Sequence, residues 1–172
     1  GLVVGIWGAL NKDKRFISSA RTSVIICAVT STASLFFLAV AFLQHSYRYL
    51  YVWQNSNNDM PSAYLISAIW GGMDGSLQLW AVLMSIFSAI ATLRSGKISE
   101  EIKSWLSPVM SGATGFFITV VCFLTNPFRL IPEGINPADG NGLNPLLQNP
   151  SMLIHPPLLY LGFTGFVVPF AY

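Results

Sequence analysis

The sequence predicts an all-α, polytopic transmembrane helix bundle with interfacial helices and an ordered external loop. Of its 172 residues, 53% are hydrophobic and only 9% are charged, whereas charged residues make up roughly a quarter of a soluble domain. Long uncharged runs alternate with short polar loops, and most basic residues lie in two of those loops. The net charge of +2 is too small to indicate a nucleic-acid partner.

Five hydrophobic segments are the predicted spans, and the first and last of them are incomplete. Residues 22–44 contain no charge and would form a helix of about 35 Å, enough to cross a hydrocarbon core of about 30 Å. The chain opens on Gly1 and stops inside an apolar run, so we expect a piece of a longer protein. The predicted spans are about 1–10, 22–44, 63–93, 105–125 and 155–172.

The third hydrophobic segment is longer than one span requires. We expect it to begin as an interfacial helix and to turn at Gly71-Gly72 before it crosses the membrane. Seven of the nine Lys and Arg residues lie in the loops around 11–21 and 94–104. Because cytoplasmic loops carry the excess of basic residues, the loops at 45–61 and 126–154 should be external.

The two external loops differ in composition. In the first, Tyr47, Tyr49, Tyr51 and Trp53 alternate with other residues, a pattern that favours a short extended piece at the membrane interface. The second contains four Asn-Pro pairs, which favour turns and are typical of a flexible connector. It also carries apolar islands that a disordered linker would lack, so we expect an ordered cap on the helix ends.

His155 is the first candidate for chemistry, because it precedes Pro156-Pro157 at the start of an apolar run. Proline is tolerated in the first turn of a helix, so these prolines should begin a helix with His155 at its edge. The positive end of a helix dipole disfavours another positive charge, so the imidazole should keep a lone pair for iron, and a haem propionate would be favoured there. The simpler alternative is an interfacial histidine with one hydrogen bond.

Asp74 is the only acid inside an apolar region, where a carboxylate at mid-membrane costs about 2.5–3.5 kcal/mol. It is either a proton site or, as we favour, an interfacial residue that caps a helix after the glycine turn. His45 is either a second ligand or, as we favour, a solvated interfacial histidine. Cys27 and Cys122 match no metal-binding spacing and are interpreted as buried, inert thiols. No phosphate loop or hydrolytic constellation is present.

Several motifs occur in the order found in one family of cytochrome c maturation proteins, that of CcmF and NrfE, which this chain resembles. The resemblance covers about 45–172, which makes it far more specific than a single motif. Three departures stand out: Met73-Asp74 replaces a common His-Glu pair, Gln78 replaces an apolar residue, and His45 has no counterpart. The matching segments are 51–57, 61–64, 70–80, 126–128 and 144–162.

The resemblance implies that residues 1–172 are the N-terminal part of a cytochrome c assembly membrane domain. The whole protein would be a haem lyase subunit that receives haem at the outer face of the membrane and supports its attachment to the CXXCH cysteines of apocytochrome c. His155 would be an axial ligand to the haem iron, with Trp70, Asp74 and Arg129 as further candidates for cofactor binding. The family's other haem-binding segments would lie downstream of this chain.

The resemblance also implies a b-type haem, delivered or resident, and several partners. These are the CcmE haem chaperone, CcmH- and CcmI-type subunits, apocytochrome c and the lipid bilayer. The implied location is the bacterial cytoplasmic membrane, or the mitochondrial inner membrane for an organellar protein. The alternative from another class is a proton- or quinone-linked transporter subunit that uses Asp74. A transporter should carry more ionisable residues at mid-span than this one.

Overall fold

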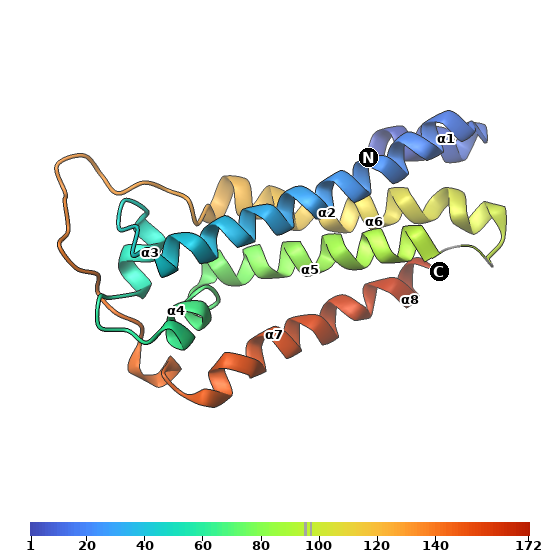
Figure 1. Cartoon of the computed structure of the whole chain (residues 1–172). Helices are drawn as coiled ribbons and strands as arrows, with labels where there is room; N and C mark the ends of the chain where they lie inside the picture. Colours follow the sequence, from blue (N-terminus) through green and yellow to red (C-terminus); the bar gives the residue numbers. More distant parts are fainter. Residues whose placement is uncertain (95, 97) are drawn as a thin grey trace.

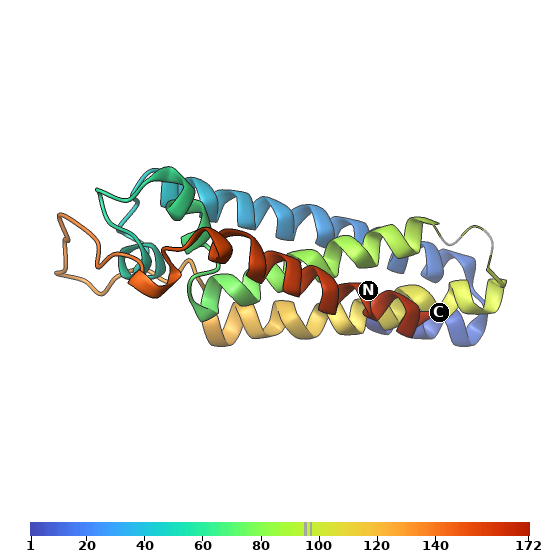
Figure 2. The ribbon, with the colours of Figure 1, turned by 90° about the horizontal axis from the view of Figure 1, so that it is seen from below.

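The computed structural model describes residues 1–94, 96 and 98–172, and its long helices run side by side (Figures 1 and 2). α5 lies at the centre, packed against α2, α6 and α7. A π-helical turn, Val121–Thr125, extends α6. The helices are α1 (Leu2–Asn11), α2 (Lys14–Leu43), α3 (Leu50–Asn55), α4 (Ser62–Ala68), α5 (Met73–Arg94), α6 (Glu100–Val120), α7 (Pro150–Gly165) and α8 (Val167–Ala171).

Among the described residues, four helical segments are long and apolar enough to cross a membrane. This confirms the predicted transmembrane bundle, although the predicted boundaries shift. α2 begins at Lys14, eight residues earlier than expected, because Lys12 adopts a left-handed conformation that reverses the chain and Asp13 accepts a hydrogen bond from the Arg15 amide at 2.9 Å. The spans are Lys14–Leu43, Met73–Arg94, Glu100–Thr125 and Pro150–Ala171.

The third hydrophobic segment divides as predicted, into the short α4 and the spanning α5. The Tyr51 hydroxyl organises the turn between them: it donates to the Ile69 carbonyl at 3.0 Å and accepts the Gly72 amide at 3.0 Å. A Cβ at Gly75 would lie 1.6 Å from the Ile69 carbonyl oxygen. Only glycine allows this close approach of the two backbones.

The first external loop is helical at residues 50–55, so the expectation of an extended piece was wrong there. Tyr51 and Val52 are the buried residues of this helix, and Tyr47 is buried in the turn before it. Extended pairing is confined to Tyr49, which forms an antiparallel bridge with Leu130. The Leu50 amide donates to the Arg129 carbonyl at 2.8 Å, which joins the two external loops.

The second external loop is an ordered cap over α3, as predicted, at the same end of the bundle as α4 (Figure 1). The Trp53 indole donates to the Asp139 carbonyl at 3.1 Å, and the Gly142 amide donates to the Ser56 carbonyl at 3.0 Å. The main hydrophobic core lies beneath it. That core includes Leu38, Phe42, Tyr51, Val52, Leu65, Ala68 and Leu143.

Hydrogen bonds between helices hold α5 within the bundle. Gln78 donates to Ser34 of α2 at 2.8 Å, and Ser88 contacts Thr114 of α6 at 2.9 Å. Such side-chain bonds stabilise helix packing where lipid supplies no hydrophobic driving force. Gln78 therefore has a structural partner in α2.

Candidate functional site

α7 begins at Pro150, not at Pro156-Pro157, so the predicted helix start was wrong. The Asn149 side chain accepts the Ser151 amide at 2.9 Å, and Pro150 occupies the first helical position. The Asn149 cap starts the helix six residues before the predicted position. His155 consequently lies inside the helix, and Asn149 rather than an external anion occupies the helix start.

Pro156 and Pro157 are internal to α7 and carry no amide hydrogen. In an α-helix, their amides would have donated to the carbonyls of Met152 and Leu153. The Trp70 indole, which comes from the turn before α5, donates to the Met152 carbonyl at 3.1 Å. A side chain from another part of the chain thus replaces one missing bond of the helix.

The His155 side chain is exposed and has no hydrogen-bond partner among the described residues. One turn further along α7, Leu158 and Leu159 have exposed fractions of 61% and 43%. Residues three and four apart share a helix face, so a single imidazole stands at the head of an apolar stripe. A free imidazole nitrogen beside a flat apolar surface fits the iron and the macrocycle of a haem.

Asp74 and Arg129 lie near one another at the cap end of α5. Asp74 is half-buried in the first turn of α5, and its charge interacts with that of the exposed Arg129. Within the described residues, no hydrogen bond or ion pair connects either side chain to His155. Asp74 lies in the first turn of α5, and its interfacial role stays a prediction.

His45 belongs to the cap. It adopts a left-handed conformation with φ 48°, and its Nδ1 lies 3.3 Å from the Tyr47 hydroxyl. Together with Arg48 and Glu133, it lines a cavity of about 510 Å³. His45 is half-buried with a tyrosine partner, so it is less solvated than expected.

Two aromatic features of the site were missed by the sequence interpretation. Trp80 of α5 packs against Tyr160 and Phe163 of α7, with ring centroids 5.4 and 6.3 Å apart. Tyr51 was assigned to the interface, but it is the buried hydrogen-bonding centre of the α4–α5 turn. Burial raises the pKa of Tyr51, which keeps its hydroxyl protonated as a donor.

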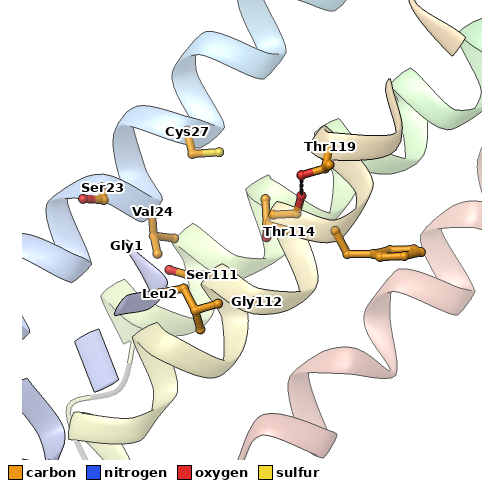
Figure 3. Close-up of a pocket in the computed structure, with 11 residues that line it drawn as sticks. Gly1, Leu2, Ser23, Val24, Cys27, Ser111, Gly112, Thr114 and Thr119 are labelled. Carbon is orange, nitrogen blue, oxygen red and sulfur yellow. Dashed lines mark hydrogen bonds between the residues drawn. The ribbon is translucent and has the colours of Figure 1, made fainter. Parts of the chain in front are cut away.

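A second cavity, of about 530 Å³, lies between α1, α2 and α6 (Figure 3). Its lining is apolar apart from small hydroxyl groups and the thiol of Cys27. No acidic or basic side chain among the described residues lines it. Cys27 is half-buried, but Cys122 is exposed, so the expectation that both thiols are buried was wrong for Cys122.

Comparison with known proteins identifies the family. A model of the cytochrome C assembly protein family matches residues 70–172. The chain is 35% identical to the Escherichia coli cytochrome c-type biogenesis protein CcmF, over 99% of this chain and 26% of that protein. It is 36% identical to CcmF of Pseudomonas aeruginosa, over 96% and 25%, and 31% identical to NrfE of Haemophilus influenzae, over 96% and 26%.

A solved structure, titled "Cytochrome c Heme Lyase CcmF", superposes with a TM-score of 0.84 at 27% identity. It covers 99% of this chain and 26% of that one. The chain thus spans about a quarter of the length of the relatives that it matches. On these findings, the chain belongs to the cytochrome c assembly protein family.

Proposed function

We propose that the full-length protein acts in cytochrome c biogenesis as a haem lyase subunit, and that His155 is an axial ligand to the incoming haem. The observation that carries this proposal is the free imidazole at the head of the exposed apolar stripe of α7. The relatives named for cytochrome c biogenesis and the haem lyase superposition support it. The haem would be of the b type, and it would be delivered to the protein or also be resident in it. This haem would supply the vinyl groups that bond to the cysteines of apocytochrome c.

This chain's own residues would bind and orient the haem. His155 offers one nitrogen lone pair, and Leu158 and Leu159 offer apolar contact area along the same helix face. Asn149 caps the start of α7, and Trp80 packs against the middle of that helix. The helical turn that carries His155 is therefore held on both sides. Arg129 and Asp74 would have a structural role at the cap and would not bind the iron.

The same proposal includes the partners and the membrane. Haem would come from a CcmE-type chaperone, with CcmH- and CcmI-type subunits presenting apocytochrome c, at the outer face of a bacterial cytoplasmic membrane. The excess of basic residues in the loops at the end opposite the cap supports this orientation. The transporter alternative loses its main support, because Asp74 lies at a helix end instead of at mid-span.

The test is a strain whose only copy of the full-length gene carries His155→Ala, scored by haem-stained c-type cytochromes and an immunoblot. The alanine variant should insert normally, since it adds no charge and leaves the Asn149 cap intact, but it should lose c-type cytochromes. His45→Ala is the matched control and should retain them. Wild-type cytochrome levels in the His155→Ala strain would overturn the ligand assignment.

A further inference from the structure

We propose that Trp70 is the positioning residue for His155, acting through the carbonyl that Pro156 leaves free. The inference rests on the proposed role of His155 as a haem ligand, but its structural part can be tested without haem. The Trp70 indole donates to the Met152 carbonyl at 3.1 Å. Met152 is the residue four positions before Pro156, so this carbonyl is the one that the proline deprives of its helical donor.

The turn that carries His155 is weakened by its own sequence. Two consecutive prolines, Pro156 and Pro157, remove two backbone hydrogen bonds directly after the histidine. Sharp bends of helices occur at such places, because the hydrogen-bond ladder is interrupted there. The direction of the imidazole therefore depends on contacts from outside α7.

Trp70 can supply such a contact because it is held rigidly itself. Its carbonyl accepts the Ser76 hydroxyl at 2.9 Å, and its amide donates to the Ser67 carbonyl at 3.1 Å. The next two residues form the turn that the buried Tyr51 hydroxyl organises. The backbone from Trp70 to Gly72 thus links the hydrogen bonds of the buried Tyr51 hydroxyl to the bond that Trp70 makes with Met152 of α7.

A second attachment lies on the other side of His155. The Trp80 ring packs against Tyr160 and Phe163, whereas Trp70 binds three residues before the histidine, at Met152. Two fixed points on either side of a proline-weakened turn restrict where its side chain can point. Without the Trp70 bond, the segment before the prolines could swing about them, and the imidazole would lose its fixed direction.

Trp70→Phe removes the indole donor while keeping an aromatic ring. Trp53→Phe is its matched control, because Trp53 also donates its indole N–H to a backbone carbonyl, that of Asp139 at 3.1 Å, but has no bond to α7. The measurement is the distance between spin labels at 73 and at 154, which lies before the prolines, both exposed, in full-length protein free of other cysteines. Trp70→Phe should broaden the distance distribution, and Trp53→Phe should leave it unchanged.

Pro156→Ala tests the chemical assignment. The substituted alanine has an amide that can donate to the Met152 carbonyl, so it should replace the bond that Trp70 makes. With Pro156 present, Trp70→Phe should accelerate hydrogen exchange at the start of α7 about fivefold, as expected for the loss of one hydrogen bond. In the Pro156→Ala background, the acceleration should largely disappear. If Trp70→Phe alone fails to fold, combining it with Pro156→Ala should recover folded protein.

The outcomes test the positioning role of Trp70 separately from the ligand role of His155. An unchanged distance distribution in Trp70→Phe, or equal broadening in Trp53→Phe, would overturn the positioning role. Equal acceleration of exchange with and without Pro156→Ala, or a double variant that still fails to fold, would overturn the assigned bond. None of these readouts needs haem, so their results do not depend on whether His155 is a haem ligand. In haem-loaded protein, Trp70→Phe should lower the fraction of haem with histidine bound, and Trp53→Phe should not.

Discussion

α5 and α7 are both parts of 22-residue apolar spans, yet they are held in very different ways. In the apolar stretch of the α5 span, 56% is buried inside the structure, against 6% for the span made by α7 and α8. α5 contacts α2 and α6 through side-chain hydrogen bonds, while α7 is attached through an aromatic stack and one indole. In Figure 1 the α7–α8 segment lies along the lower edge of the bundle.

This difference indicates that the scaffold, formed by the cap and α5, and the candidate site on α7 are separate parts of this chain. The cap and α5 use many small and polar side chains to fix a single arrangement. α7 keeps an apolar face and a free imidazole available, which a binding surface requires. Substitutions on α5 should therefore change folding, and substitutions on the outward face of α7 should change binding.

The largest expected effect comes from Gly75→Ala in α5. The new Cβ would lie 1.6 Å from the Ile69 carbonyl oxygen and 2.7 Å from the Tyr51 hydroxyl, so the α4–α5 turn cannot form. We expect no folded protein by size-exclusion chromatography in detergent. Gly162→Ala in α7 is the control, since nothing lies within 4 Å of its Cβ. Normal elution of Gly75→Ala would contradict the close approach described for this turn.

Tyr51→Phe should have the next largest effect. Removing the hydroxyl leaves the Ile69 carbonyl and the Gly72 amide without their partner, which costs about 1–3 kcal/mol for buried groups. The measurement is the free energy of unfolding in mixed micelles. Tyr160→Phe on α7 is the control, because no hydrogen bond of its hydroxyl occurs among the described residues. Equal losses in both variants would remove the contrast between the two helices.

Asp74→Asn should have a small effect. The substitution keeps the size of the side chain and removes one negative charge at the start of α5, a change worth about 0.3–1 kcal/mol at a helix N-terminus. Cytochrome assembly in the complemented strain should stay near the wild-type level. A complete loss at normal protein abundance would instead show that the charge itself is required and would revive the proton-site alternative.

The smallest expected effect is a pH dependence confined to the cap. The amides of Asn58 and Gly140 donate to Asp139 and lower the pKa of that carboxyl. A lowered folded-state pKa stabilises the cap above the unfolded value of about 4, and this contribution is lost as the pH falls further. Trp53 fluorescence should report the loosening, since its indole bonds to residue 139. Asp139→Asn should abolish this acid transition, and its persistence would assign it to another group.

A related transition is expected at the alkaline end. Burial and the neighbouring Asp139 raise the pKa of Tyr47 to about 12. A raised folded-state pKa means that the neutral phenol stabilises the cap below its unfolded value of about 10. That contribution is lost as the pH rises through the folded-state value. The same Trp53 fluorescence measurement in Tyr47→Phe should lack this transition.

Much of the fold could be predicted from hydrophobicity alone, because long uncharged runs have few alternatives to spanning helices. The division of 63–93 into α4 and α5 was also predictable, since Gly71-Gly72 interrupts an overlong run. The helix over 50–55 was not, because alternating aromatics favour an extended piece at the interface, whereas the adjacent residues Tyr51 and Val52 are both buried in the core. Tertiary burial decided between the extended piece and the helix.

At the candidate site, the sequence singled out His155 as a candidate but did not predict its surroundings. His155 stood out as a histidine beside two prolines, yet the start of α7 depended on the Asn149 cap. The bond from Trp70 to Met152 joins residues 82 positions apart. No local pattern encodes such a contact, although two prolines inside a helix imply that two carbonyls need other partners.

The most direct test of the central claim is the ligand set of haem bound to purified full-length protein, read by magnetic circular dichroism. His155→Gly should lose the signature of one histidine ligand, and added imidazole should restore it by filling the space that the side chain left. His45→Gly, the other histidine variant of this chain, should keep the wild-type spectrum. A wild-type spectrum in His155→Gly without imidazole would contradict the account.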